Sequence, residues 1–105
     1  MKDSWIGIDL DGTLAYYDGW KGEEHIGEII PEMKRRLLRY IDDGNTVKIF
    51  TARADSPKAV QAIKKWLKDN GIPDLEVTNV KDYGMKLLCD DQCIPVLKNT
   101  GEVLI

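Results

Sequence analysis

The sequence predicts a small α/β protein with a mainly parallel sheet flanked by helices. Short apolar segments alternate along the chain with two longer segments whose apolar residues recur every three or four positions. This is the pattern of strands alternating with amphipathic helices. Strands that are connected through helices pair in parallel. The 105 residues suffice for one domain with a modest core, and we expect a single domain over residues 1–105.

A strand is expected at residues 5–8, and a long segment without a regular pattern follows it, from Ala15 to Ile30. Connections of that length are usually functional or carry a small hairpin. Asp18 and Gly19 form a typical hairpin-turn pair. We therefore expect residues 15–30 to form a flap over the carboxyl end of the first strand.

Two helices are predicted from their start signals and apolar stripes. The first begins at Pro31, which lacks the amide hydrogen that would stay unpaired in the first turn. Its stripe includes Leu37, and Gly44 ends it. The second helix has Ser56 as its N-cap and Pro57 as its first residue.

Five further strands are predicted from short apolar runs bounded by turn residues. The last two are joined by the tight turn Asn99-Thr100-Gly101. The five strands cover residues 47–50, 75–80, 85–89, 94–97 and 102–105.

Composition and charge argue against several classes of function. The net charge is −3 and the pI is about 5.1, so the chain as a whole has no attraction to nucleic acid or anionic membranes. No apolar run approaches the roughly 18 residues that cross a bilayer, and no signal peptide is recognisable. We expect a cytoplasmic protein without a membrane partner, and the sequence makes no prediction of its oligomeric state. A basic cluster on the first helix is interpreted as a solvated face; it contains Lys34, Arg35, Arg36 and Arg39.

The cysteine and histidine content does not favour a zinc site. Cys89 and Cys93 are the two cysteines, and His25 is the one histidine. In a reducing cytosol we expect two free thiols. His25 lies in the predicted flap, where contact with a substrate is an alternative to an ordinary surface role.

Reactive side chains follow four of the predicted strands. Ligands bind at the carboxyl ends of the strands in open α/β sheets, so these side chains are expected to meet at one edge. Paired carboxylates there repel one another and resist desolvation unless a cation or a reaction accommodates them. In chain order the residues are Asp9 and Asp11, Thr51 to Arg53, Asn79 to Lys81, and Asp90 and Asp91.

This set resembles the four motifs of the haloacid dehalogenase (HAD) superfamily of phosphotransferases, in the same order. The first motif, Asp9-Leu10-Asp11-Gly12-Thr13, is the most specific, and the resemblance extends from Ile6 to Asp91. It implies Mg²⁺-dependent hydrolysis of a small phosphomonoester through an aspartyl-phosphate. The acid at position 11 favours phosphatases over family members that cleave carbon–halogen bonds.

The resemblance also implies a role for each site residue. Asp9 is the nucleophile, and Asp11 is the general acid and base. Asp9 and Asp90 contribute side-chain oxygens to Mg²⁺ and Asp11 its backbone carbonyl, whereas Asp91 orients a bound water. Phosphate oxygens are bound by Gly12, Thr51, Ala52 and Lys81.

Two features depart from larger members of the family. Lys81 precedes Asp90 by only nine positions, which leaves no room for a helix between the third and fourth strands. Lys86 is a competing candidate for the catalytic lysine, but it lies inside a predicted strand, so we favour Lys81 at a strand end. The chain has no cap domain beyond the flap and in this resembles small phage and bacterial HAD-type hydrolases.

Two assignments stay open. Arg53 either clamps a phosphate or carboxylate of the substrate or pairs with Asp55. The aromatic residues of the flap either stack on a nucleobase or sugar or hold the flap together; they are Tyr16, Tyr17 and Trp20.

Two other functions are alternatives. An open site with flap aromatics fits a phosphatase of polynucleotide ends or nucleotides, although the acidic pI does not favour nucleic acid. A small flap excludes water poorly, which weakens electrostatic catalysis. A regulatory module that binds Mg²⁺ and phosphate without turnover is therefore the alternative outside catalysis.

Overall fold

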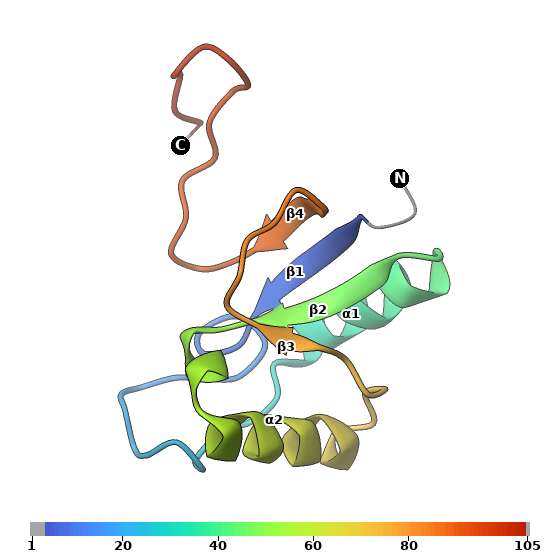
Figure 1. Cartoon of the computed structure of the whole chain (residues 1–105), viewed down its shortest axis with the longest axis vertical. Helices are drawn as coiled ribbons and strands as arrows, with labels where there is room; N and C mark the ends of the chain where they lie inside the picture. The colour runs from blue at the N-terminus through green and yellow to red at the C-terminus, as the bar shows by residue number, and fades with distance from the viewer. Residues whose placement is uncertain (1–3, 105) are drawn as a thin grey trace.

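The computed structural model describes residues 4–104 and contains a parallel sheet of four strands (Figure 1). The strands are β1 (Trp5–Asp9), β2 (Thr46–Phe50), β3 (Val77–Thr78) and β4 (Met85–Cys89). Their order in the sheet is β3-β2-β1-β4, and all three pairs are parallel. The predicted fold class is confirmed, and β4 lies at an edge of the sheet.

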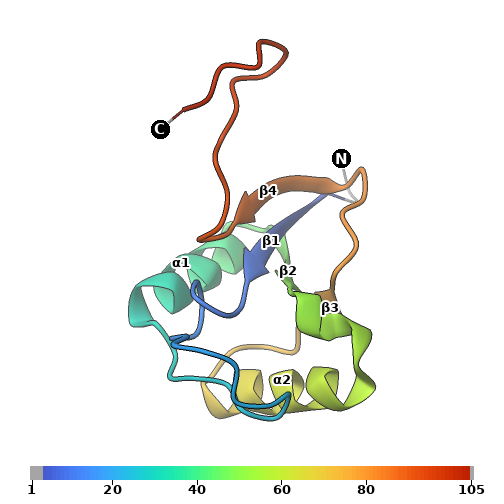
Figure 2. The same cartoon turned by 90° about the vertical axis from the view of Figure 1, so that its left-hand side faces the viewer.

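Both helices pack on one face of this sheet. Alternate residues of β1 and β2 form a buried cluster with the apolar stripes of α1 (Pro31–Asp42) and α2 (Pro57–Asp69). Successive strand residues point to opposite faces, so a shared cluster places the two helices on the same side (Figure 2). The cluster includes Ile6, Ile8, Val47 and Ile49 from the strands and Leu37, Ile63 and Leu67 from the helices.

Trp5 covers part of the opposite face, beside the loop that joins β3 to β4. It is only 1% exposed, and its indole nitrogen donates to Asp82 Oδ1 at 2.7 Å. Lys48 Nζ lies 4.6 Å from the centroid of the Trp5 ring system. A large aromatic side chain of this kind buries about 150–250 Å². Trp5 therefore covers part of a face on which neither α1 nor α2 packs.

Both predicted helix starts are confirmed. Pro31 and Pro57 are the first residues of α1 and α2. The Ser56 hydroxyl caps α2 by accepting a hydrogen bond from the Ala59 amide at 3.2 Å. A short 3₁₀ helix, η1 (Ala52–Asp55), lies between β2 and α2 and was not predicted.

The later strands differ from the prediction. The third strand was expected over residues 75–80, but β3 has two residues, which pair with Ile49 and Phe50 at the carboxyl end of β2. The strands expected at 94–97 and 102–105 are wrong for the residues that the structure describes. Residues 92–104 extend away from the sheet (Figures 1 and 2), and the single bridge among them joins Val96 to Val103. Ile105 and residues 1–3 lie outside the described residues.

The flap at residues 15–30 forms hairpin pairing only at its base. The Tyr16 amide donates to the Glu28 carbonyl at 2.8 Å, and Ala15 forms an antiparallel bridge with Ile29. Gly27 is required at this base, because a Cβ there would lie 1.9 Å from the Tyr16 carbonyl oxygen. The indole nitrogen of Trp66 in α2 donates to the Gly27 carbonyl at 3.0 Å, which ties the flap to the body. Within residues 4–104, no helix is long and apolar enough to cross a membrane.

Candidate active site

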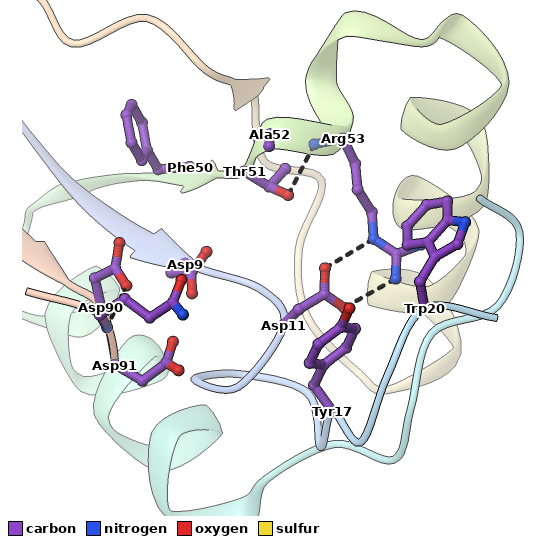
Figure 3. A pocket seen from close by; sticks show the side chains of 11 residues that line it. Asp9, Asp11, Tyr17, Trp20, Phe50, Thr51, Ala52, Arg53, Asp90 and Asp91 are labelled. Carbon is purple, nitrogen blue, oxygen red and sulfur yellow. Dashed lines mark hydrogen bonds and ion pairs between the residues drawn. The ribbon is translucent and has the colours of Figure 1, made fainter. Parts of the chain in front are cut away.

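The ends of three strands and the flap surround one cavity of about 460 Å³. Figure 3 shows Asp9, Asp90 and Asp91 on one side of it and Asp11, Arg53 and Trp20 on the other. The β1 end contributes Asp9 and Asp11, and the β4 end contributes Asp90 and Asp91. The predicted convergence of these carboxylates at one sheet edge is therefore present. The β2 end contributes Phe50 to Arg53, and the remaining lining residues are Tyr17, Trp20 and Gln92.

Three carboxylates form a cluster that suits a hard divalent cation. One oxygen each from Asp9, Asp90 and Asp91 lies within 4.8 Å of the others. Burial, the hydrogen bond with Asp91 and the charge of Asp90 together raise the pKa of Asp9 to about 7. Oxygen ligands of this kind are what Mg²⁺ prefers, and a bound cation would relieve their mutual repulsion. Asp91 was expected only to orient a water, yet its carboxylate belongs to the same cluster as the other two.

Thr13, the last residue of the first motif, connects this motif to the fourth, a role that was not predicted. Its hydroxyl oxygen accepts a hydrogen bond from the Asp91 amide at 3.0 Å. The same oxygen lies 3.1 Å from Asp91 Oδ1 and 3.3 Å from Asp9 Oδ2. One hydroxyl hydrogen serves one acceptor at a time, so Thr13 donates to either carboxylate. A hydroxyl next to paired acids was the signal that could have identified it.

Gly12 provides the room in which Asp91 lies. Its φ is +89°, a conformation that glycine adopts without strain. A Cβ at this position would lie 2.6 Å from Asp91 Oδ2 and 2.9 Å from Asp91 Cγ. Gly12 was predicted as a phosphate-binding residue, but it is not among the residues that line the cavity. The requirement that the structure shows for it is the close approach of Asp91.

Arg53 pairs with Asp11, which corrects the predicted alternative of Asp55. Nε of Arg53 donates to Asp11 Oδ2 at 2.8 Å, and Nη2 donates to Oδ1 at 2.9 Å. Arg53 is 7% exposed because the η1 turn directs its side chain back over the β1 end. Among the described residues that line the cavity, Arg53 is the one cation.

Thr51 both caps η1 and lines the cavity. It is 4% exposed, and its hydroxyl caps η1 by accepting a hydrogen bond from the Arg53 amide at 3.2 Å. Thr51 and Ala52 both line the cavity, as expected for the second motif. A capping hydroxyl also fixes the direction in which the backbone leaves β2.

Three other predicted site residues lie elsewhere. Lys81 and Lys86 are exposed, and neither is among the cavity-lining residues. Lys81 lies in the loop that carries the chain back from β3 to the start of β4, and Lys86 lies within β4. His25 lines a separate hollow with Trp66 on the α2 side of the flap.

Comparison with known proteins supports the fold. No protein-family model matches the chain, and the comparison with curated proteins finds no significant match. A solved structure of a conserved protein from Bacteroides thetaiotaomicron is similar, with a TM-score of 0.63 and 19% identity over 84% of this chain and 75% of that chain. At this identity the likeness shows the parallel-sheet α/β fold and nothing finer.

Proposed function

We propose that this protein is a Mg²⁺-dependent phosphomonoester hydrolase of the HAD type. The observation that carries the proposal is the meeting of Asp9, Asp90 and Asp91 within 4.8 Å of one another, with Asp11 lining the same cavity. Mg²⁺, when bound by this cluster, would neutralise charge on the phosphoryl oxygens. The first, second and fourth motifs, which line this cavity, support the family assignment, whereas Lys81 of the third motif is not among the lining residues.

The reaction uses two carboxylates, Asp9 and Asp11, in the roles that the resemblance implies. A carboxylate oxygen of Asp9 attacks phosphorus, the ester P–O bond breaks, and protonated Asp11 gives its proton to the leaving oxygen. Asp11 then takes a proton from water, whose oxygen attacks the phosphorus of the aspartyl-phosphate. The P–O bond to Asp9 breaks, and inorganic phosphate leaves with Asp9 and Asp11 regenerated.

A phosphate-release assay with p-nitrophenyl phosphate tests the proposal. We expect turnover in Mg²⁺, loss of turnover in EDTA, and a loss of at least about 10³-fold in Asp9→Asn. Asp74→Asn is the matched control, because its carboxylate pairs with Lys64 outside the cavity. Tight phosphate binding without turnover would instead favour the regulatory module, and equal rates in Asp9→Asn would refute the hydrolase.

A nucleotide phosphatase is the second candidate, and it is favoured by the flap aromatics. Tyr17 and Trp20 line the cavity, whereas Tyr16 is not among its lining residues. Ribose 5-phosphate and adenosine 5′-monophosphate have the same leaving group and differ by the base. A kcat/KM at least about tenfold higher for the nucleotide, lost in Trp20→Ala, would support base stacking. Equal values would argue against it.

A further inference from the structure

We propose that the tail, residues 92–104, is a dimerisation element. In a pair of copies, the tail of each packs on the helix-free face of the other copy's sheet, which is the face opposite α1 and α2. The partner is a second copy of this chain, and the same contact is made twice around a two-fold axis, so the assembly closes after two copies. The inference does not depend on the proposed hydrolase activity.

The tail has apolar side chains that its own chain leaves in solvent. Figures 1 and 2 both show the tail clear of the sheet and of the two helices. Within residues 4–104, no residue of the tail belongs to the buried core. Scattered apolar residues are ordinary on a surface, whereas several on one projecting segment indicate contact with another molecule. Five large apolar side chains of the tail are 46–60% exposed: Ile94, Val96, Leu97, Val103 and Leu104.

The tail folds back on itself and so has a definite shape. The Leu97 amide donates to the Glu102 carbonyl at 2.9 Å, and Val96 is bridged to Val103. Bridged residues of this kind lie side by side and form one apolar surface. A two-stranded hairpin is marginally stable alone in water and needs an apolar surface to pack on. The tail therefore requires such a surface from outside itself.

The helix-free face offers an apolar surface around Gly7. A Cβ on Gly7 would lie 3.1 Å from side-chain atoms of Trp5, Met85 and Leu88. These three side chains therefore converge over a residue that has no side chain. Trp5 is buried, but Met85 and Leu88 are only half-buried, so both remain accessible to a second copy.

The loop that joins β3 to β4 extends the helix-free face. Asp82 accepts the hydrogen bond from the Trp5 indole nitrogen, which holds the loop against this side of the sheet. The loop's Val80 is 60% exposed and its Tyr83 is fully exposed. An aromatic side chain of this kind is typical of protein interfaces.

The edge of β4 is a less suitable surface for the tail. Lys86 is exposed within β4 and lies at a shift in the register between β4 and β1. A lysine and an irregular register both protect an edge strand from pairing with another chain. We therefore place the tail on the face of the partner's sheet and not along its edge.

The surface area of the chain is large enough for this contact. The accessible surface is 7102 Å², about 1,150 Å² more than a compact monomer of this mass exposes. A standard interface buries about 800 Å² on each partner. The radius of gyration is 14.0 Å, compared with about 12.9 Å for a compact chain of this length. Burial of the tail and of the helix-free face accounts for an excess of this size.

Size-exclusion chromatography with light scattering tests the inference. At about 100 µM we expect twice the mass of one chain, because interfaces of this size have affinities from µM to pM. Val96→Asp/Val103→Asp alters the tail alone, and Val80→Asp/Tyr83→Asp alters the helix-free face alone. Each is expected to raise the dimer dissociation constant at least about 100-fold, because it buries unpaired charge. The four side chains are at least 47% exposed within one chain, so we expect unchanged thermal melts of the monomers. Tyr16→Asp is the matched control, since Tyr16 is a 61% exposed flap residue, and is expected to leave the dimer unchanged.

A mixture of the two double variants distinguishes exchange from other modes of pairing. A mixed pair has one intact tail facing one intact helix-free face, a combination that neither variant has with itself. We therefore expect mixed dimers to form where each variant alone is monomeric.

Four results would overturn the inference, and none of them involves catalysis. A monomeric unaltered protein would exclude the dimer, and a mass that grows beyond two copies with concentration would exclude closed exchange. An unweakened dimer of Val80→Asp/Tyr83→Asp would show that the tail does not pack on this face. Absence of mixed dimers would show that the tail and the face do not contact each other across copies.

Discussion

Thr13 and Asp91 lie 78 positions apart in the chain, yet the Thr13 hydroxyl oxygen accepts a hydrogen bond from the Asp91 amide at 3.0 Å. This bond joins the turn after the central strand β1 to the turn after the edge strand β4. The carboxylates of Asp9 and Asp91 lie beside the same hydroxyl. The geometry of the proposed cation site therefore depends on a side chain that need not contact the cation.

Thr13→Val is expected to weaken Mg²⁺ binding about tenfold while leaving the fold intact, because it removes a hydroxyl that orients two ligands. Isothermal titration with Mg²⁺ at pH 7.5 measures the change. Thr13→Ser keeps the hydroxyl and is the control. Unchanged affinity in Thr13→Val would show that Asp9 and Asp91 are oriented by other contacts.

Gly12→Ala is expected to cost more stability than Gly44→Ala. Both glycines have φ close to +90°, so both variants bear a backbone strain of about 1–2 kcal/mol. A Cβ at position 44 meets open space, whereas one at position 12 overlaps Asp91. Urea unfolding gives the difference, and Mg²⁺ titration is expected to show weakened binding in Gly12→Ala alone. Equal effects of the two variants would contradict the close packing of Asp91.

The stability of the metal-free protein is expected to fall as pH rises from about 4 to above 7. The pKa of Asp9 is raised from 3.8 to about 7, so the folded state binds a proton that the unfolded state has released over this window. The stabilising contribution is complete below pH 3.8 and is lost through pH 7. Urea unfolding in EDTA measures it, and Asp9→Asn is expected to lack this component.

Mg²⁺ affinity is expected to rise with pH, whereas the stability of the metal-free protein falls. A cation competes with the proton on Asp9, and pH 5 lies about two units below the pKa of this carboxyl. Affinity is therefore expected to be about 100-fold weaker at pH 5 than at pH 8, as measured by titration calorimetry. Equal affinities would mean that Asp9 is not a ligand.

Trp5→Phe is expected to destabilise the protein by about 2 kcal/mol, because the smaller ring leaves space on the helix-free face and loses the indole hydrogen bond. Guanidinium unfolding measures the change. Trp20→Phe is the control, because Trp20 is 60% exposed and its replacement is expected to cost little. Mg²⁺ affinity is expected to stay unchanged in both. A cost below about 0.5 kcal/mol would show that Trp5 is dispensable for this face.

Local signals in the sequence predicted much of the fold. Pro31, Ser56 and Pro57 mark helix starts through their own backbone chemistry, and these starts are where the structure has them. β4 was predicted with its bounds at Met85 and Cys89. The segments at 94–97 and 102–105 have a strand-like composition as well, but no strand of the sheet pairs with the part of them that the structure describes, residues 94–97 and 102–104. Strand formation depends on such a partner, which composition does not reveal.

The part of the site that lies at the strand ends was predictable from the sequence. Asp9 is the last residue of β1 and Asp11 lies just after it, while Asp90 and Asp91 follow β4. Because β1 and β4 pair in parallel, the meeting of these carboxylates follows from topology. Lys81 was expected on the same rule, but β3 ends at Thr78 and leaves Lys81 in the returning loop. The partner of Arg53 was not predictable, because Asp11 lies 42 positions away and the η1 turn that directs Arg53 has no strong sequence signal.

The placement of β4 at the edge of the sheet bears on how the chain folds. Pairing of β1 with β2 encloses α1, and pairing of β2 with β3 encloses α2, so both are comparatively short-range events. β4 joins the opposite edge of β1 with Met85 beside Trp5, which closes a longer stretch of chain, so we expect this pairing to form last. On this expectation, two of the three clustered carboxylates, Asp90 and Asp91, join the site together with β4. A divalent ion bound by these carboxylates would then stabilise the pairing of β4 with β1 and favour the complete sheet over a partly folded chain.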